Sequence, residues 1–120
     1  MIIKTSNLTG AALDWAVSVL EGYQPVYTDG SLTPVFRKGE AVQKEWPSFS
    51  TDVVKGTTII FREGISLLFA DNNVWGARPK QDGITSTNDS FGETPLIAGL
   101  RCYVTSVHGK TVRVPDELTK

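Results

Sequence analysis

Two segments, one near each end of the chain, carry apolar residues at helical spacing. In residues 9–21 the apolar positions cover a broad arc, which is typical of a helix buried on two sides, so we expect this helix to be the central element. Thr9 is placed to cap it and Gly22 to end it. A second amphipathic helix is predicted from Thr94, a capping residue followed by proline, to about His108.

Shorter apolar runs between turn residues predict β-strands. Residues 2–5 and 111–114 predict the first and the last strand, and residues 23–36 predict a pair of strands around a central turn. Residues 65–77 predict a hairpin whose turn contains two asparagines, a residue type that tolerates positive φ. Residues 57–63 fit either a strand or a short helix.

The order of these elements predicts a single α+β domain over residues 1–120. Helices and strands do not alternate regularly, which argues against a doubly wound parallel sheet. We expect two amphipathic helices packed on a small mixed or antiparallel sheet. The polar segment 79–93 is longer than most loops, which leaves open whether it is functional or merely mobile.

Composition narrows the classes of function. Lys and Arg total 12 and Asp and Glu total 13, which gives a net charge of −1. Duplex DNA binding depends on clustered basic residues, so this balance argues against nucleic acid as a partner. No segment approaches the ~20 apolar residues that cross a bilayer, and no signal-peptide-like run opens the chain. We therefore expect a cytoplasmic protein with no membrane partner.

The residue types that carry common enzyme chemistry are scarce. Cys102 and His108 are the only cysteine and histidine, so a zinc site with four such ligands is excluded. They lie about 120° apart on the predicted second helix and do not face each other. The motifs of serine hydrolases and the glycine-rich phosphate loops are absent. We predict no enzyme, no cofactor and no catalytic or metal-binding residue; a carboxylate- or metal-dependent enzyme is the least favoured alternative.

Aromatic and charged residues of the centre and second half suggest a contact surface. Tryptophans in irregular or edge segments often anchor partners, although a core position is the favoured interpretation for each. Basic residues follow the second of these tryptophans, and the polar segment 79–93 comes next. The predicted interaction surface consists of Trp46, Trp75, Arg78, Lys80, Asn88 and Asp89.

Arg101 lies at the edge of the apolar arc of the predicted second helix. A guanidinium in such a place either reaches solvent along its aliphatic stem or pairs with a carboxylate at reduced dielectric. We predict a structural ion pair, and the alternative is a ligand-binding arginine. The candidate carboxylates are Asp14, Asp52 and Glu63.

Three blocks of the sequence resemble the phage NinX proteins. They are Ile3-Lys4-Thr5 with Leu8-Thr9-Gly10-Ala11-Ala12-Leu13-Asp14-Trp15-Ala16-Val17, then Ser50-Thr51-Asp52 with Arg62-Glu63-Gly64-Ile65 and Trp75-Gly76-Ala77, and finally Thr94-Pro95-Leu96-Ile97-Ala98 with Arg101-Cys102-Tyr103-Val104. Members tend to carry Gly-Gly-Pro where this chain has Gly56-Thr57-Thr58, and tryptophan in place of Val53. A proline there suits a helix start, which favours a short helix in residues 57–63.

The resemblance implies a biological setting without a mechanism. NinX-like proteins are small phage or prophage proteins with no established activity, so no site residue is carried over. We expect a phage accessory protein, a non-enzymatic binding module that modulates or inhibits a host protein. The alternative is an adaptor in phage DNA replication or recombination.

Overall fold

The structure is a computed structural model that describes residues 1–28, 31–36, 47–70, 72–80 and 89–119. Within these residues the α-helices are α1 (Gly10–Leu20), α2 (Val53–Arg62) and α3 (Pro95–His108). The predicted α+β class is confirmed, with a third helix added to the two that were expected. Two short 3-10 helices are also present. η1 (Thr5–Asn7) follows the first strand, and η3 (Asp116–Thr119) lies at the end of the described residues.

The strands pair antiparallel in three separate sheets rather than in the single sheet that was predicted. The first sheet pairs β1 (Ile2–Lys4) with β7 (Thr111–Arg113), and the second is a hairpin of β2 (Tyr23–Thr28) and β3 (Ser31–Phe36). The third has the order β4–β5–β6 and consists of Ser66–Ala70, Val74–Arg78 and Ser90–Gly92.

Capping and turn residues lie at the helix starts and the turn that the sequence predicted. Thr94 accepts a hydrogen bond from the backbone N–H of Ile97 at 3.1 Å, and proline occupies the first turn of α3. Asn72 and Asn73 have φ of 62° and 60°, the left-handed values that the β4–β5 turn requires. Thr9 occupies the N-cap position of α1 with extended backbone, but its side chain makes no cap hydrogen bond.

The segment that the sequence left open between strand and helix is helical. Asp52 caps α2 by accepting a hydrogen bond from the backbone N–H of Lys55 at 3.1 Å. Ile59 and Ile60 are buried on the side that packs against α3. A Cβ at Gly99 of α3 would collide with the Ile60 side chain, so this close approach of α2 and α3 requires glycine.

The central element is α3, and the expectation that the first helix would take this place is wrong. α3 contacts α1, α2 and all three strands of the β4–β5–β6 sheet, as well as β7 and η1. The main core lies around α1 and α3 and includes Leu13, Val17, Leu100 and Val104, each fully buried. A second cluster of Ala77, Ala98 and Cys102 joins α3 to the sheet. α3 is central because it presents apolar side chains to both clusters, whereas α1 serves only the first.

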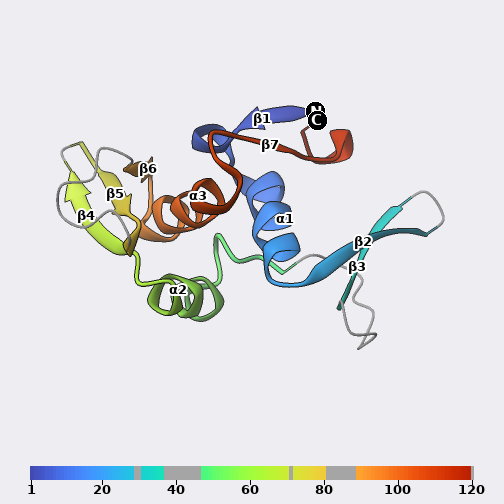
Figure 1. Cartoon of the computed structure of the whole chain (residues 1–120), viewed down its shortest axis with the longest axis horizontal. Coiled ribbons are helices and arrows are strands. Elements are labelled where there is room, and N and C mark those ends of the chain that lie inside the picture. Colours follow the sequence, from blue (N-terminus) through green and yellow to red (C-terminus); the bar gives the residue numbers. More distant parts are fainter. Residues whose placement is uncertain (29–30, 37–46, 71, 81–88, 120) are drawn as a thin grey trace.

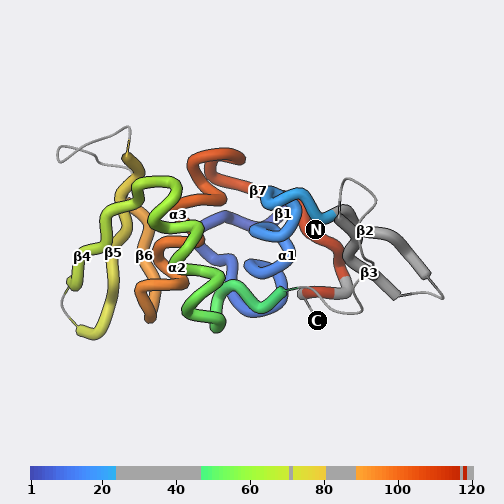
Figure 2. The backbone as a smooth tube through the Cα atoms, turned by 90° about the horizontal axis from the view of Figure 1, so that it is seen from below, coloured from blue at the N-terminus to red at the C-terminus, as the bar shows by residue number. Residues whose placement is uncertain are grey.

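The elements follow one another along an elongated body of 47 × 28 × 22 Å. The β4–β5–β6 sheet forms one end and the β2–β3 hairpin the other, with α3 and α1 between them (Figure 1). α2 lies alongside α3, as the view from below also shows (Figure 2). The two termini meet, since the amino group of Met1 donates to the Val114 carbonyl at 3.0 Å and to Asp116 Oδ1 at 2.8 Å. None of the helices in the described residues is long and apolar enough to cross a membrane.

Candidate functional site

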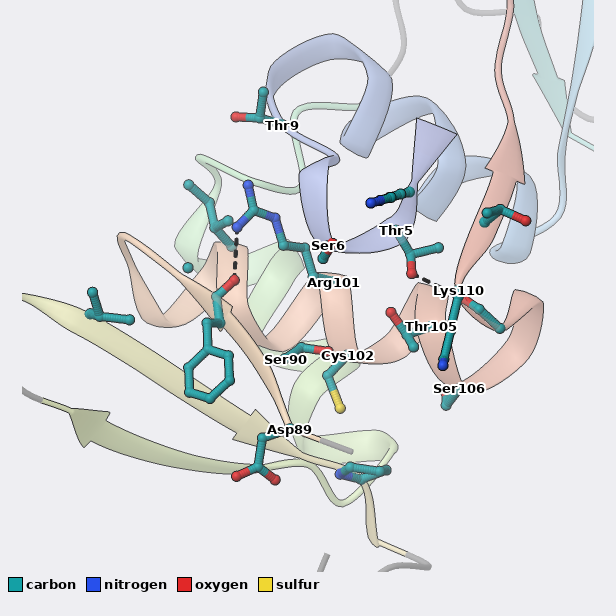
Figure 3. Close-up of a pocket in the computed structure, with 18 of the residues that line it drawn as sticks. Thr5, Ser6, Thr9, Asp89, Ser90, Arg101, Cys102, Thr105, Ser106 and Lys110 are labelled. Carbon is teal, nitrogen blue, oxygen red and sulfur yellow. Dashed lines mark hydrogen bonds between the residues drawn. The ribbon is translucent and has the colours of Figure 1, made fainter. Parts of the chain in front are cut away.

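An open groove of about 1150 Å³ runs over α3, between β6 and the N-terminal segment that contains η1. Figure 3 shows Thr5, Ser6 and Thr9 on the side of the N-terminal segment and Ser90 and Asp89 on the side of β6. Among the described strands β6 forms an edge of its sheet, and the groove lies beside this edge. The residues that line it are mostly polar and include Lys4, Thr5, Ser6, Thr9, Asp89, Ser90, Glu93, Arg101, Thr105, Ser106, Lys110 and Thr111.

Arg101 ties the two walls of the groove together. Its Nε donates to the carbonyl of Leu8 at 2.7 Å, just before α1, and its Nη1 donates to the carbonyl of Phe91 in β6 at 2.7 Å. The second of these bonds is drawn in Figure 3. Partial burial lowers the pKa of Arg101, and the nearby charge of Glu93 opposes this shift. The arginine remains cationic in this position, because its ordinary pKa lies far above neutral.

The predicted ion pair of Arg101 with a carboxylate is wrong. Asp14 instead accepts a hydrogen bond from the backbone N–H of Ser50 at 2.8 Å, and Asp52 caps α2. Glu63 is bound by the Nε of its sequence neighbour, Arg62, at 2.8 Å. Helical spacing placed Arg101 at the edge of the apolar arc correctly, but it could not show that two backbone carbonyls from distant segments converge there.

Two residues of the predicted interaction surface pair with each other. Arg78 donates from Nε to Asp89 Oδ1 at 2.9 Å and from Nη2 to Oδ2 at 3.0 Å, a bidentate ion pair. The Arg78 hydrogen bonds hold the pKa of Asp89 below its usual range, and burial opposes them only in part. Asp89 therefore contributes little net negative charge to the groove that it borders.

The β4–β5–β6 sheet has one covered and one exposed face. Paired residues of an antiparallel sheet point their side chains to the same face, so Leu68, Gly76 and Phe91 form one row across the outer face. Gly76 leaves space in the middle of this row, and the Phe91 ring lies over it, 3.4 Å from where a Cβ would be. Arg78 is on the same face, two residues along β5. This apolar row beside an ion pair is called the outer sheet face below.

Of the other members of the predicted interaction surface, Trp75 does not join Arg78 and Asp89 on this face. Trp75 alternates with Gly76 and packs on the inner side, against the cluster that includes Cys102, with its ring 5.2 Å from that of Phe69 in an edge-to-face contact. Lys80 is exposed, and its aliphatic stem covers Gly64. Trp46 and Asn88 lie outside the described residues.

The sequence as a whole matches a known family. The model of a family described as Bacteriophage P22, NinX covers residues 4–107. The chain belongs to this NinX family. The resemblance carried by the three sequence blocks is thereby confirmed, and the setting is that of a phage accessory protein. No curated protein is detectably similar to the chain.

This NinX-family chain also contains a charged network that the sequence did not reveal. Arg62 at the end of α2 donates to both carboxylate oxygens of Glu21, which follows α1, at 2.8 and 2.7 Å. The hydroxyl of Tyr103 in α3 donates to the same carboxylate at 2.7 Å, and the guanidinium lies 5.7 Å from the centre of the Tyr103 ring. The network joins three helices whose contact no local pattern predicts, so sequence reasoning had no signal for it.

Cys102 and His108 occupy different environments on α3. The Cys102 side chain is buried in the cluster between α3 and the sheet, whereas His108 is exposed at the C-terminal end of the helix. Among the residues that the structure describes, no three His, Cys, Asp or Glu side chains are grouped closely enough to hold a metal ion. The groove and the outer sheet face are thus the features to which a function can be attached.

Proposed function

We propose that this protein acts in the cytoplasm of a bacterial host as a non-enzymatic phage accessory protein that binds a host protein and modulates or inhibits it. Membership of the NinX family supports the phage setting. The mode of action is supported by one structural observation, the exposed apolar row on the outer sheet face.

The outer sheet face has the composition of a protein-binding surface. Leu68 is 50% exposed and Phe91 is 52% exposed, although both belong to a sheet whose inner face is packed on α3. Interfaces between proteins combine a central apolar patch, enriched in aromatic residues and arginine, with a polar rim. Here the apolar row is bordered by the Arg78–Asp89 ion pair, whose bidentate geometry fixes both side chains before any partner arrives. Such a preformed surface loses little conformational entropy on binding.

The proposal is tested by retention of host proteins on the immobilised protein. We expect a specific host protein to be retained from lysate by the unchanged chain and lost with Leu68→Thr/Phe91→Thr, because threonine keeps strand propensity but removes the apolar surface. The matched control is Val54→Gln/Phe61→Gln on α2, which alters two apolar side chains that are 76% and 75% exposed. Retention by the control must match that of the unchanged chain.

Two results would contradict this proposal. The first is the absence of any retained host protein across a range of salt concentrations. The second is a retained protein that is lost equally with the sheet variant and the α2 variant. Binding to duplex or single-stranded DNA that weakens steeply as salt rises would instead support the adaptor in replication or recombination.

A further inference from the structure

Arg101 keeps hydrogen-bonding capacity that the fold does not use. A guanidinium carries five N–H donors, and the Leu8 and Phe91 carbonyls each take one. Neutral carbonyls do not cancel its charge, and within the described ranges no carboxylate is within ion-pair distance of it. A positive group with unused donors therefore lines the floor of the groove, oriented by two bonds to its walls.

The other charges of the groove reinforce this positive character. Lys4 and Lys110 line the groove together with Arg101, while Asp89 and Glu93 are its acidic members. The ion pair with Arg78 compensates the charge of Asp89. Glu93 is then the one uncompensated acidic residue among the described residues that line the groove, which also include the three cations. The chain as a whole has a net charge of −1, so this local excess of positive charge is not a consequence of overall composition.

The form of the groove indicates the size of its ligand. Its volume of about 1150 Å³ exceeds the ~300–1,000 Å³ of typical small-molecule pockets, and it is partly open to solvent. The hydroxyl groups of Ser6 and Thr105 line it, where they can donate to or accept from a peptide backbone, while the Thr5 hydroxyl already donates to the Gly109 carbonyl at 3.0 Å. An extended chain segment fits these dimensions better than a compact metabolite.

We propose that this groove binds an extended acidic peptide segment, with an Asp or Glu carboxylate held by the unused N–H groups of Arg101 and further acidic side chains attracted by Lys4 and Lys110. Guanidinium groups bind carboxylates in a fork geometry, which makes Arg101 the main recognition residue. The assignment to a protein partner rests on the proposed function, whereas the preference for carboxylates rests on the groove alone. Phe91 lines both the groove and the outer sheet face, so one partner can occupy the two together.

The proposal is tested by fluorescence anisotropy with the full chain and a short labelled peptide in which glutamate alternates with serine. We expect binding of this peptide and at least tenfold weaker binding of its glutamine counterpart. Lys4→Gln/Lys110→Gln should weaken binding of the glutamate peptide by about three- to tenfold, the range expected for two exposed ion pairs. Lys55→Gln, which removes an exposed lysine from α2, is the control and should leave the affinity unchanged.

Arg101→Lys separates recognition by the fork from simple charge. It keeps the charge and one donor direction, and we expect about fivefold or greater loss of affinity because the planar fork is removed. Far-UV circular dichroism and thermal unfolding verify that this variant is folded. The Lys4→Gln/Lys110→Gln variant tests the same groove without altering the bonds to Leu8 and Phe91. The proposal therefore remains testable even if Arg101→Lys does not fold.

Three outcomes would overturn the proposal. One is equal affinity for the glutamate and glutamine peptides. Another is competition by free glutamate or inorganic phosphate at the concentration of the peptide itself, since the groove would then recognise a small anion and not a chain segment. The third is tighter binding of a single-stranded oligonucleotide than of the glutamate peptide. The first two results do not bear on whether the outer sheet face retains a host protein, so failure of the groove proposal is distinguishable from failure of the proposed function. The third would count against both, because it favours the adaptor alternative.

Discussion

Arg62 and Arg101 place the same chemical group in two contrasting environments. Arg62 stands where the ends of α1 and α2 meet α3, with the Glu21 and Glu63 carboxylates and the Tyr103 hydroxyl around it. Arg101 stands in the groove, and its hydrogen-bond partners among the described residues are two backbone carbonyls. The Arg62 side chain is nevertheless 47% exposed, so the more accessible arginine is the one whose charge is compensated.

This contrast separates a structural charge from a charge that remains available. When a guanidinium is paired with a carboxylate, the two charges largely cancel and a ligand is attracted only weakly. The pairing also raises the pKa of the guanidinium further above its usual value, as it does for Arg62 beside Glu21. A guanidinium held by carbonyls is positioned equally well but keeps its net charge. The second arrangement combines a role in the fold with a role in binding, and this is why Arg101 supports the proposal for the groove.

Replacing Arg101 with methionine should have the largest effect on stability. It removes the donor to the partly buried Leu8 carbonyl and the donor to the exposed Phe91 carbonyl, and we expect a loss of about 2 kcal/mol in the free energy of unfolding, most of it from the unsatisfied buried group. Chemical denaturation followed by circular dichroism measures this loss. A loss below that caused by Arg62→Met would show that the carbonyl bonds do not brace the two walls.

Replacing Arg62 with methionine should cost about 1 kcal/mol at neutral pH, a value reduced by the exposure of its side chain. The hydrogen bond from Arg62 is the main cause that lowers the pKa of Glu21 from its ordinary 4.5. A lowered pKa in the folded state gives stability that is present above the unfolded value and lost as pH falls through the folded value.

The difference in the free energy of unfolding between the Arg62→Met variant and the unchanged chain should therefore have its full value at neutral pH. It should shrink as pH falls below about 4.5, the pKa of Glu21 in the unfolded chain. Denaturation midpoints measured from neutral to acidic pH give this profile. A difference that stays constant with pH would assign the stabilisation to packing on the Tyr103 ring instead of to the ion pair.

Replacing Asp14 with asparagine should have the smallest effect. Asp14 is the acidic counterpart of Arg101, since it accepts hydrogen bonds from the backbone N–H and the side chain of Ser50 and forms no ion pair with a described residue. Burial raises the pKa of Asp14, so ionisation disfavours the folded state at neutral pH and this penalty is relieved as pH falls through the raised value. Asparagine keeps the accepting oxygen without the charge, and we expect stability within about 0.5 kcal/mol of the unchanged chain, on the more stable side.

Denaturation at neutral pH measures the effect of Asp14→Asn, with Ser50 left intact. A loss of more than about 1 kcal/mol would show that the negative charge itself stabilises the fold, against the general cost of desolvating an unpaired carboxylate.

Local signals predicted most of the secondary structure. Thr94 followed by proline, Asn72 with Asn73, and the apolar spacing of residues 9–21 each depend on neighbours within one or two turns of chain, and each was located correctly. The helix at Val53–Arg62 was left open because Ile59 and Ile60 suit both a strand and a helix by propensity. Packing against Gly99 favours the helix, and no window around residue 60 contains that information.

The candidate site was only partly accessible to the same reasoning. Arg101 was singled out as an unusual charge on an apolar helix, and Arg78 and Asp89 were both named for a contact surface. The partners of Arg101 were not predicted, because its bonds reach residues 93 and 10 positions away along the chain. Trp75 and Arg78 were named for one contact surface, but they lie three residues apart on β5 and therefore point to opposite faces of the sheet.

The amino-acid sequence by itself determined the α+β class, the positions of the caps and turns, and membership of the NinX family, because these properties depend on residue order over short distances or on the whole string at once. Only the tertiary structure decided which charges meet and which remain uncompensated. The energy of an ion pair or of a carbonyl brace depends on distance in space, and Glu21, Arg62, Leu8 and Arg101 acquire their distances when three helices and an edge strand pack together.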